Sequence, residues 1–415
     1  MLLRARIVLP VSQTPIVDGS VKVFRGRIVA VGPWRDFSAS VRKQTIDLGE
    51  VVLLPGLVNA HCHLDYTGLA GEFLPPKHFT DWLKLIVAAK GVRSDAEFAA
   101  NWRRGAQMLL RTGTTTVADI EAVPGLLPAA WNATPLRVLS FLEITGIKSL
   151  RDPGAILREA VVKILSLPAG RCRAGLSPHA PYSTTPELLC LTTQTAHHRH
   201  WFVTTHVAES LEEFEMFAQG RGKLFDWLRR NERDISDCGF GSPVQHLERS
   251  GLLGPNFLAV HANCLTPRDT QLLARRGASV VHCPRSHSFF GHPKFPFQEL
   301  SAAGVNICLG TDSLASIEAK RKQPLELNMF SEMRSFARKN PGGSAETILR
   351  MSTINGAQAL GLSGRVGEIT KGAFADLIAL PCREKLTDVY EAILRHHDAV
   401  AASMIGGQWA IAPKV

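Results

Sequence analysis

LLPGLVNAHCHLD, residues 53–65, is the stretch that decides the fold class of this chain. It reads as a buried strand over residues 53–60, followed by His61 and His63, which are separated by a single residue. Residues two apart on a strand face the same side, so both imidazoles can reach one metal ion. A lone pair of this kind is as often structural as it is metal-binding. Its interpretation therefore depends on what the other strands carry.

Apolar segments rich in β-branched residues recur along the chain and alternate with segments of helical periodicity. The predicted strands cover residues 53–60, 115–120, 136–144, 172–176, 202–205, 257–260, 278–281 and 305–309. Predicted helices between them include residues 96–111, 211–231 and 267–276. Strands that alternate with helices indicate a parallel sheet, and eight such units fit a closed (β/α)8 barrel of the α/β class.

Polar side chains follow most of the predicted strands at their carboxyl ends. Barrels of this kind carry their active sites at that face, because the connecting loops converge there. The residues are His61, His63, His179, His206, Glu209, His261, His282, His287 and Asp312. We therefore expect one polar centre at this end of the barrel.

The motifs at these strand ends resemble, in kind and order, those of the amidohydrolase superfamily. They are PGLVNAHCHLD, GTTTVAD, SPHAPYSTTPEL, THVAES, VHANCL, CPRSH and GTDSLAS, and the resemblance covers nearly the whole chain. Within the superfamily, the chain is most similar to the deaminases and chlorohydrolases that act on nitrogen heterocycles. The resemblance implies a (β/α)8 barrel enzyme that hydrolyses carbon–nitrogen bonds in cyclic amidines.

The resemblance makes His61, His63, His206 and Asp312 the ligands of one divalent metal ion, with zinc as the first expectation and iron as the second. Neutral imidazoles and a carboxylate suit both metals and leave a coordination position for water. A second ion in this superfamily usually requires a carbamylated lysine on the fourth strand. Residues 172–179 contain no lysine, so we expect a mononuclear site. Taken singly, each ligand has a plainer alternative as a core histidine or a turn aspartate.

Catalytic roles for Glu209, His261 and Asp312 follow from the same resemblance. Glu209 is expected to protonate the ring nitrogen beside the attacked carbon, and His261 to assist water deprotonation and hold the developing oxyanion. Asp312 is expected to pass the proton of the water to the leaving amine. Ammonia then departs and a lactam remains. For Glu209, the alternative is a first-turn acid on the helix that begins near residue 211, which Ser210 could equally cap.

Substrate contacts are expected from His179, Trp82, Arg285 and His287. The segment 65–99, which contains Trp82, resembles the pocket-shaping loop in deaminases of S-adenosylhomocysteine, methylthioadenosine and aminodeoxyfutalosine. A ribose-binding glutamate is expected there in the first two groups, and Glu97 is a candidate by position alone. Arg285 is expected to pair with the carboxylate tail of an aminodeoxyfutalosine-type substrate.

The expected function is hydrolytic deamination of an adenosine-like nucleoside. Guanine, cytosine and triazines are alternative substrates, and dechlorination and cyclic-amide hydrolysis are alternative reactions. Glu209 favours deamination, because that reaction requires protonation of a ring nitrogen. Outside enzymes, the alternative is a metal-free scaffold protein, against which the complete set of ligands argues.

Both ends of the chain read as short strands, at residues 4–9, 21–24, 27–31, 375–380 and 402–411. Gly406 and Gly407 form a hairpin signal within the last of these. Similar amidohydrolases commonly build a small β-sandwich from both termini. We therefore expect a composite β-sandwich domain, residues 1–52 and 364–415, and a barrel domain, residues 53–363.

Composition excludes several classes of function. The net charge is +10 over 415 residues, but Lys and Arg are dispersed and no nucleic-acid motif is present, so no nucleic-acid partner is expected. No apolar run reaches membrane-spanning length, and residues 1–6 lack the apolar core of a signal peptide. Eight single cysteines fit a reducing cytoplasm. We expect a cytoplasmic enzyme with a small-molecule substrate; homo-oligomers are common among similar enzymes.

Overall fold

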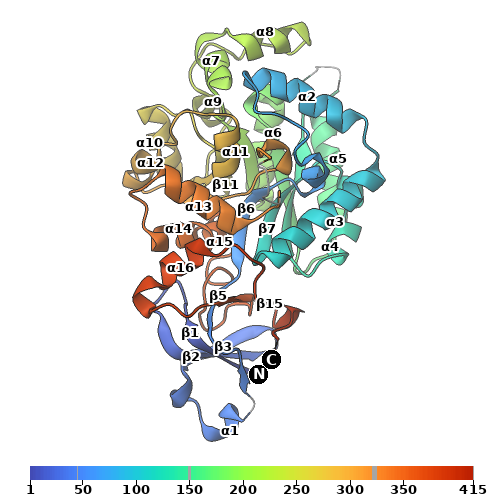
Figure 1. Ribbon diagram of the computed structural model, residues 1–415. Helices are drawn as coiled ribbons and strands as arrows, with labels where there is room; N and C mark the ends of the chain where they lie inside the picture. The colour runs from blue at the N-terminus through green and yellow to red at the C-terminus, as the bar shows by residue number, and fades with distance from the viewer. Residues whose placement is uncertain (44, 148–150, 320–324, 415) are drawn as a thin grey trace.

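The computed structural model describes residues 1–43, 45–147, 151–319 and 325–414, and these form two separate sheets (Figure 1). Most of the chain surrounds a parallel sheet in which each strand pairs with the next along the sequence. Its strands are β6 (Leu57–Cys62), β7 (Thr114–Glu121), β8 (Arg137–Ile144), β9 (Arg173–Pro178), β10 (Val203–Val207), β11 (Phe257–His261), β12 (Ser279–His282) and β13 (Asn306–Leu309). Each corresponds to a predicted strand, because strands buried on both faces read as apolar runs.

The sheet closes into a barrel where β13 meets β6. The main-chain N–H groups of Thr311 and Asp312 both donate to the carbonyl of His61, at 3.0 and 3.1 Å, and Cys62 forms a parallel bridge with Asp312. Gly310 makes this approach possible, since a Cβ there would lie 2.8 Å from the Cβ of His61. The predicted (β/α)8 barrel is confirmed.

Helices surround the barrel and connect its strands. Around it lie α2 (Phe79–Gly91), α3 (Asp95–Arg111), α4 (Ala129–Asn132), α5 (Pro153–Ser166), α6 (Pro186–Arg199), α7 (Leu211–Gln219), α8 (Lys223–Arg230), α9 (Pro243–Arg249), α10 (Pro267–Arg276), α11 (Pro284–Phe289), α12 (Phe297–Ala302), α13 (Met329–Lys339), α14 (Ala345–Met351), α15 (Ile354–Ala359) and α16 (Val389–Arg395). Among the described residues, no helix is both long enough and apolar enough to cross a bilayer.

Two of the predicted helices are confirmed and the third is divided. Residues 96–111 and 267–276 form α3 and α10, and each helix begins at a capping box. Residues 211–231 form α7 and α8 instead of one helix, because Gly220 and Gly222 adopt φ values of +63° and +104° between them. Glycine takes these conformations at little steric cost, and apolar periodicity does not reveal them.

α2, α7 and α8 lie at the end of the molecule opposite the chain termini (Figure 1). Hydrogen bonds and an ion pair connect the start of α2 to the starts of α7 and α8. Glu212 on α7 accepts hydrogen bonds from the main-chain N–H groups of Phe79 and Thr80, at 3.1 and 3.0 Å, and Lys223 on α8 pairs with Asp81 of α2 at 2.6 Å. These helices therefore cover the carboxyl ends of the barrel strands as a connected roof.

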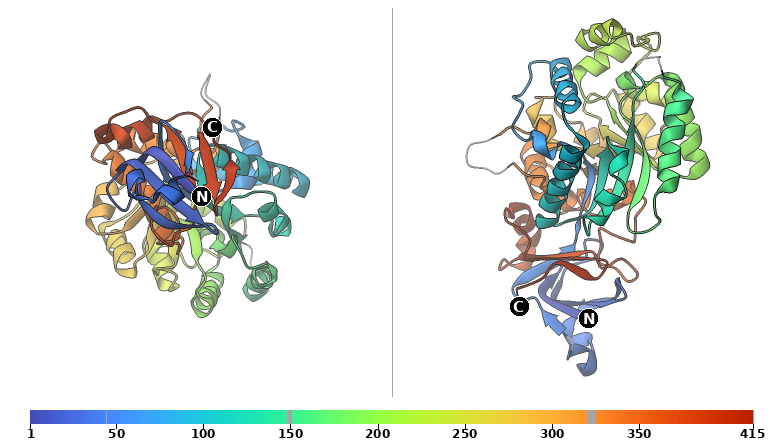
Figure 2. Two further views of the ribbon diagram at one scale, coloured as in Figure 1. Left: turned by 90° about the horizontal axis from the view of Figure 1, so that it is seen from below. Right: turned by 90° about the vertical axis from the view of Figure 1, so that its right-hand side faces the viewer.

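The second sheet is built from both ends of the chain (Figure 2). It contains β1 (Leu2–Val8), β2 (Ile16–Phe24), β3 (Arg27–Pro33), β4 (Thr45–Asp47), β5 (Val51–Pro55), β14 (Leu377–Pro381), β15 (Ala402–Ile405) and β16 (Gln408–Ile411); α1 (Ala39–Arg42) lies between β3 and β4. The sheet folds over on itself, since Arg27 of β3 bridges to Phe374 just before β14. Leu3, Leu53 and Met404 belong to the apolar core so enclosed. The predicted small β-sandwich from both termini is confirmed.

The strand predicted over residues 53–60 is two strands in two sheets. Leu53 and Leu54 belong to β5, which pairs with β14 in the terminal sheet, and the barrel strand β6 begins only at Leu57. Gly56 separates the two, and a Cβ at this position would lie 2.1 Å from Oγ1 of Thr115. The change from one sheet to the other could not be predicted from the sequence, because residues 53–60 form one largely apolar run. The division into domains at residues 52 and 364 stays a prediction; the pairing of β5 supports a boundary at Gly56.

Candidate metal and substrate site

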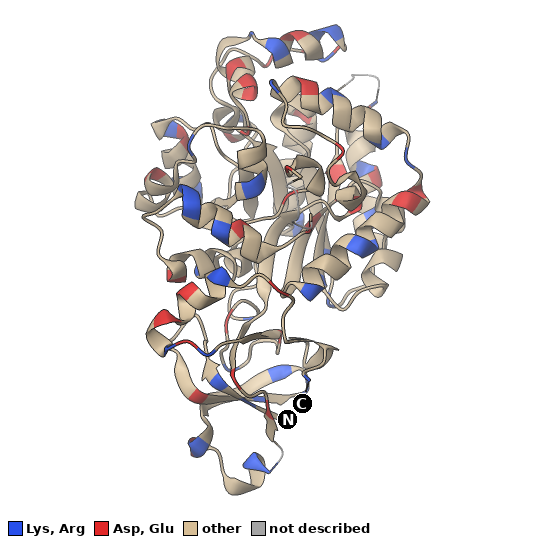
Figure 3. Ribbon diagram, viewed as in Figure 1, with Lys and Arg blue, Asp and Glu red and all other residues tan. Residues whose placement is uncertain are grey.

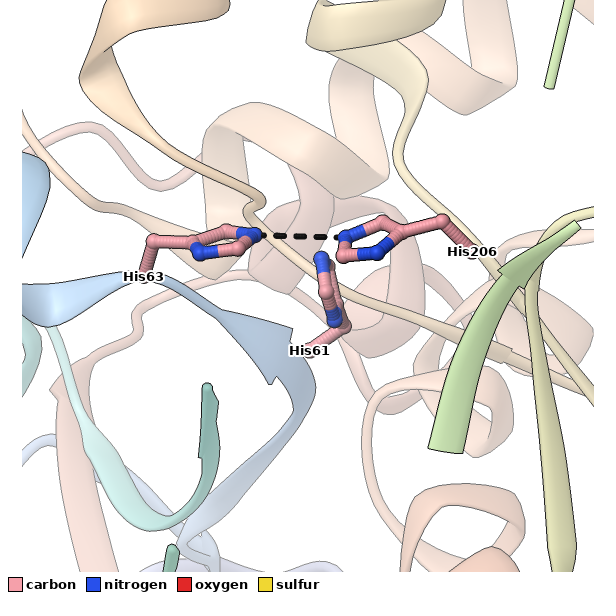
Figure 4. Close-up of side chains that lie close together, drawn as sticks. All are labelled: His61, His63 and His206. Carbon is pink, nitrogen blue, oxygen red and sulfur yellow. Dashed lines mark hydrogen bonds between the residues drawn. The ribbon is translucent and has the colours of Figure 1, made fainter. Parts of the chain in front are cut away.

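Three histidines converge at the carboxyl end of the barrel (Figure 4). His61 is on β6, His63 directly follows β6, and His206 is on β10. All three are buried, and they offer ring nitrogens that lie within 4.8 Å of one another. The Nε2 atoms of His63 and His206 are only 3.3 Å apart. Three imidazoles that point at a common centre can hold a metal ion.

Asp312 brings a carboxylate to the same centre. Its Oδ1 lies 3.7 Å from Nε2 of His61 and also 3.7 Å from Nε2 of His63, while Oδ2 accepts a hydrogen bond from Ser316 at 3.2 Å. Asp312 has a φ of +54°, in the left-handed region that non-glycine residues rarely adopt. The structure thus brings together all four residues that were expected from the sequence to bind the metal: His61, His63, His206 and Asp312.

The donor set fits a divalent metal ion. Neither ring nitrogen of the buried His61 has a hydrogen-bond partner among the described residues. A buried polar atom without a partner is costly, and a metal ion at this centre would satisfy Nε2. Nδ1 of His206 lies 2.8 Å from the main-chain carbonyl of His179 and donates to it, which leaves Nε2 free to bind.

The charge states of these groups suit metal binding. Burial lowers the pKa of His63 to about 3, so its imidazole is neutral. Burial opposes ionisation of Asp312, but the rings of His61 and His63, each with Nε2 at 3.7 Å from Oδ1, and the nearby ring of His261 outweigh it and hold the pKa of Asp312 well below its usual value. The site therefore offers neutral nitrogens and an ionised oxygen, the forms that bind a cation.

Glu209 lies beside this centre in a different charge state. Burial, followed by the nearby charges of Asp312 and Glu213, raises the pKa of Glu209 well above its usual value. Its Oε1 lies 3.6 Å from Nε2 of His261, which is at the end of β11 and whose pKa burial lowers to about 3. A carboxyl group that keeps its proton can act as a general acid.

Glu209 does not cap the helix that follows it. The N-cap of α7 is Ser210, whose Oγ accepts a hydrogen bond from the N–H of Glu213 at 3.1 Å. The main chain of Glu209 is fixed by two contacts, from its N–H to Glu213 at 2.8 Å and from Asn263 to its carbonyl at 3.0 Å. Its side chain is thus left to face the cavity.

A cavity of about 470 Å³ opens onto these side chains. His63, His206, Glu209, His261 and Asp312 line one end of it. The roof helices and the barrel loops supply largely apolar walls, formed by Tyr66, Trp82, Leu83, Ile86, Phe98, Ile147, Tyr182, Trp227 and Leu228. Its size suits a drug-sized or nucleoside-sized molecule. The structure places two of the predicted substrate contacts, Trp82 and His179, in this lining.

Sequence reasoning missed two charged residues of the cavity wall. Glu143, near the end of β8, places Oε2 at 3.3 Å from Nζ of Lys90 in the last turn of α2, and Oε1 at 3.9 Å from Nε2 of His179. Burial acts to raise the pKa of Glu143, but Lys90 and the nearby histidines outweigh it and bring the pKa to about 2. The sequence did contain a signal for Glu143, which is the single carboxylate near the carboxyl end of the otherwise largely apolar strand β8.

Arg285 and His287 do not reach this cavity, contrary to the sequence-based expectation. Arg285 is the second residue of α11 and pairs with the buried carboxylate of Glu332 on α13. His287 places Nε2 at 2.7 Å from the carbonyl of Pro293. Both side chains are thus held by neighbouring elements outside the cavity. Glu97 is also elsewhere, exposed in the capping box of α3.

Comparison with known proteins places this site in a family. Residues 52–409 match the amidohydrolase family, and the chain belongs to it. It is 32% identical over 396 residues to the 5-methylthioadenosine/S-adenosylhomocysteine deaminase of Syntrophobacter fumaroxidans, a match that covers 90% of this chain and 83% of the relative. A solved adenosine deaminase from Xanthomonas campestris with bound zinc superposes with a TM-score of 0.82 at 27% identity, covering 98% of this chain and 92% of that one. Aminofutalosine deaminase from Helicobacter pylori, at 22% identity, shares the fold with a TM-score of 0.87 over 99% of this chain and all of its own.

Proposed function

We propose that this protein is a metal-dependent hydrolase that deaminates an adenosine-like nucleoside and releases ammonia. The observation that carries the proposal is the placement of Glu209, a buried carboxyl group whose pKa is raised, beside His261 in the cavity that also exposes His63, His206 and Asp312. An acid next to a metal-binding cluster is the arrangement that hydrolysis of a cyclic amidine requires. The names of the relatives support the same reaction.

Zinc is the metal we propose for His61, His63, His206 and Asp312. Three nitrogens and one oxygen suit it, and the related adenosine deaminase contains zinc. When bound, such an ion supplies a Lewis acid that makes a water molecule acidic near neutral pH. Asp312, the ionised oxygen donor of the set, can accept the proton that this water gives up.

The remaining steps belong to Glu209, His261 and Asp312. Glu209 transfers its proton to the ring nitrogen beside the amino-bearing carbon, which makes that carbon electron-poor as water adds to it. His261 steadies the oxygen of the adding water. Asp312 then delivers the proton it accepted to the amino group, so that the carbon–nitrogen bond breaks and ammonia leaves. The hydroxyl left on the carbon returns its proton to Glu209, and the ring becomes a lactam.

The cavity walls support a nucleoside as the substrate. Tyr66, Trp82 and Phe98 offer aromatic surface to a flat ring. Beyond His179, the wall continues with Glu143 and then Lys90, an ionised acceptor and a donor that match the hydroxyl groups of a sugar. A neutral hydroxyl can donate to the first and accept from the second. A carboxylate tail on the substrate would find no partner in Arg285, because its guanidinium group pairs with Glu332 outside this cavity.

The described cysteines are all free, which supports the cytoplasm as the location that we propose. Assembly into a homo-oligomer stays a prediction.

Ammonia release from a panel of compounds tests the proposal. The panel contains adenosine, methylthioadenosine, S-adenosylhomocysteine, adenine, guanine, cytosine and an aminated triazine, each incubated with the zinc-loaded protein. We expect the adenosine derivatives to be the best substrates by kcat/KM. Guanine, cytosine or the triazine as the best substrate would contradict the nucleoside assignment, and the absence of ammonia from every compound would contradict deamination.

A further inference from the structure

A second cavity, of about 580 Å³, lies outside the catalytic pocket, and the two share no lining residue in the described part of the chain. Its walls come from α11, from α13, from residues 317–318 and 325–328, and from His397 beyond α16. α13 carries Arg334, Arg338 and Lys339, and α11 carries Arg285; Lys and Arg positions are blue in Figure 3. The reaction proposed above makes no use of this cavity.

One face of α13 is turned toward the cavity. Ser331, Arg334, Ser335 and Arg338 line it, and their spacing of three and four residues puts them on a single side of the helix. The opposite side carries buried apolar residues such as Met333 and Phe336, which account for the packing of α13. Hydroxyl and guanidinium groups thus alternate along the side of the helix that lines the cavity.

The positive charge of this face is poorly neutralised. Arg334 donates to the carbonyls of Leu394 and His396 and, at 2.9 Å, to Oγ of Ser331, but none of these acceptors is a carboxylate. Burial lowers the pKa of Arg334 to about 10, and the positive charges of Arg338 and Arg285 add to the effect. The guanidinium groups therefore repel one another in a partly buried space.

Two more cations at the cavity mouth are unpaired. Arg338 and Lys339 are exposed and have no ion-pair partner in the parts of the chain that are described. The described part of the cavity lining contains two carboxylates, Glu318 and Glu326. Glu326 forms an ion pair with Arg111, a residue outside the lining. An excess of cations in a concave wall focuses positive potential into the cavity.

We propose that this cavity is a binding site for the phosphate groups of a small phosphorylated metabolite, such as a nucleoside diphosphate. Forked guanidinium donors match phosphate oxygens, and the hydroxyls of Ser331 and Ser335 add neutral donors between them. The volume suits a molecule of nucleotide size. A compact cavity favours a small ligand over nucleic acid, which is bound along extended basic stripes.

Calorimetric titration with uridine diphosphate tests the site on the metal-loaded protein at about 0.15 M salt, where exposed charges are screened. The uracil ring has no amino group to hydrolyse, so the catalytic pocket does not consume the probe. We expect saturable binding of one molecule per chain and much weaker binding of uridine, which lacks phosphate and has only the nucleoside pocket to enter. Uridine binding as tightly as its diphosphate would overturn the proposal, as would failure of the diphosphate to saturate.

Matched variants locate the binding. The double variant Arg338→Gln with Lys339→Gln removes two exposed cations. It should lower the affinity for uridine diphosphate by about tenfold or more. Arg103→Gln with Arg275→Gln removes the same charge from exposed positions that do not line the cavity, and should leave binding unchanged. Equal weakening in both pairs would mean an effect of net charge alone and would overturn the site.

A second variant, Arg334→Lys, keeps the charge and should weaken binding, because lysine lacks the forked donors of the guanidinium group. Tighter binding of a short RNA than of the diphosphate would also contradict a metabolite site.

Discussion

Nδ1 of His206 donates a hydrogen bond to the main-chain carbonyl of His179 over a distance of 2.8 Å. This contact fixes the tautomer of His206, so that Nε2 faces His63 and the proposed metal position. The side chain of His179 meanwhile lines the substrate cavity, with Nδ1 at 2.6 Å from Oγ of Ser183. The main-chain carbonyl of His179 therefore orients a proposed metal ligand, while the side chain of the same residue lines the cavity proposed for the substrate.

Removal of a histidine ligand should release the metal. We expect His63→Ala and His206→Ala to lose most of the bound ion, because each deletes one of three converging nitrogens. His198→Ala, at an exposed position of α6, is the matched control and should keep about one ion per chain. Elemental analysis after dialysis measures the difference. Full retention of metal by both ligand variants would disprove the assignment.

Neutralising the proposed acid should stop catalysis and spare the metal. Glu209→Gln cannot release a proton to the ring nitrogen, so kcat/KM should fall by roughly a hundredfold or more. Metal content and thermal stability should stay close to those of the unmodified protein. Glu187→Gln, an exposed glutamate near the start of α6, is the control for the substitution itself. Near-normal turnover of Glu209→Gln would show that another group supplies the proton.

The pKa of Glu209 should determine the pH above which kcat/KM falls. Glu209 is active in its protonated form, and its pKa is raised well above the usual value by burial and by Asp312 and Glu213. Activity should therefore persist at pH values at which an ordinary glutamate is fully ionised, and fall as the pH rises through this raised pKa. A profile of kcat/KM against pH on metal-saturated protein measures it. Loss of activity already near the pKa of a free glutamate would contradict the assignment.

Glu143 and Lys90 should distinguish nucleosides from free bases. Glu143→Gln and Lys90→Met each remove one partner of the pair that faces the cavity, and we expect kcat/KM for adenosine to fall by about tenfold while that for adenine changes little. Lys84→Met removes a half-exposed lysine of the same helix and serves as the control. Equal losses on both substrates would indicate a structural role instead of contact with the sugar.

Stability should depend on pH through Glu213. Burial raises the pKa of this carboxyl to about 8, although three main-chain N–H groups partly offset the effect. Because the folded state binds the proton more tightly than the unfolded chain, stability is greatest below the unfolded pKa and is lost as the pH rises through about 8. Between pH 5 and pH 8, Glu213→Gln should lose less stability than the unmodified protein, by about 2 kcal/mol or more. Denaturant unfolding at both pH values measures this difference, and parallel losses would contradict it.

The barrel could be predicted because its determinants are local. Each strand is an apolar run, and its polar residues follow at one end, so order and spacing placed a polar centre at that end, and the resemblance to amidohydrolases selected His61, His63, His206 and Asp312 from it. Gly56 and Gly220 show where this fails. Both mark breaks in segments that read as continuous, and the breaks arise from close contacts and backbone angles that periodicity does not record.

The cavity walls were harder to predict, because they depend on side-chain direction. Trp82 was placed in the pocket by the resemblance of its loop, whereas Arg285 is directed away by its pairing with Glu332, a residue far along the chain. Glu143 and Lys90 meet only because α2 folds across the end of β8. Contacts of this kind become visible only when the tertiary structure is known.

The closure of the barrel determines when the proposed metal site can form during folding. Asp312 reaches the histidines only when the end of β13 docks on His61, the first ligand in sequence, some 250 residues earlier. Contacts so distant along a chain form late, since each requires a large loop to close. High-affinity capture of an ion should therefore mark the last stage of maturation, and a chromophoric metal such as cobalt would report the arrival of newly made chains at their finished state.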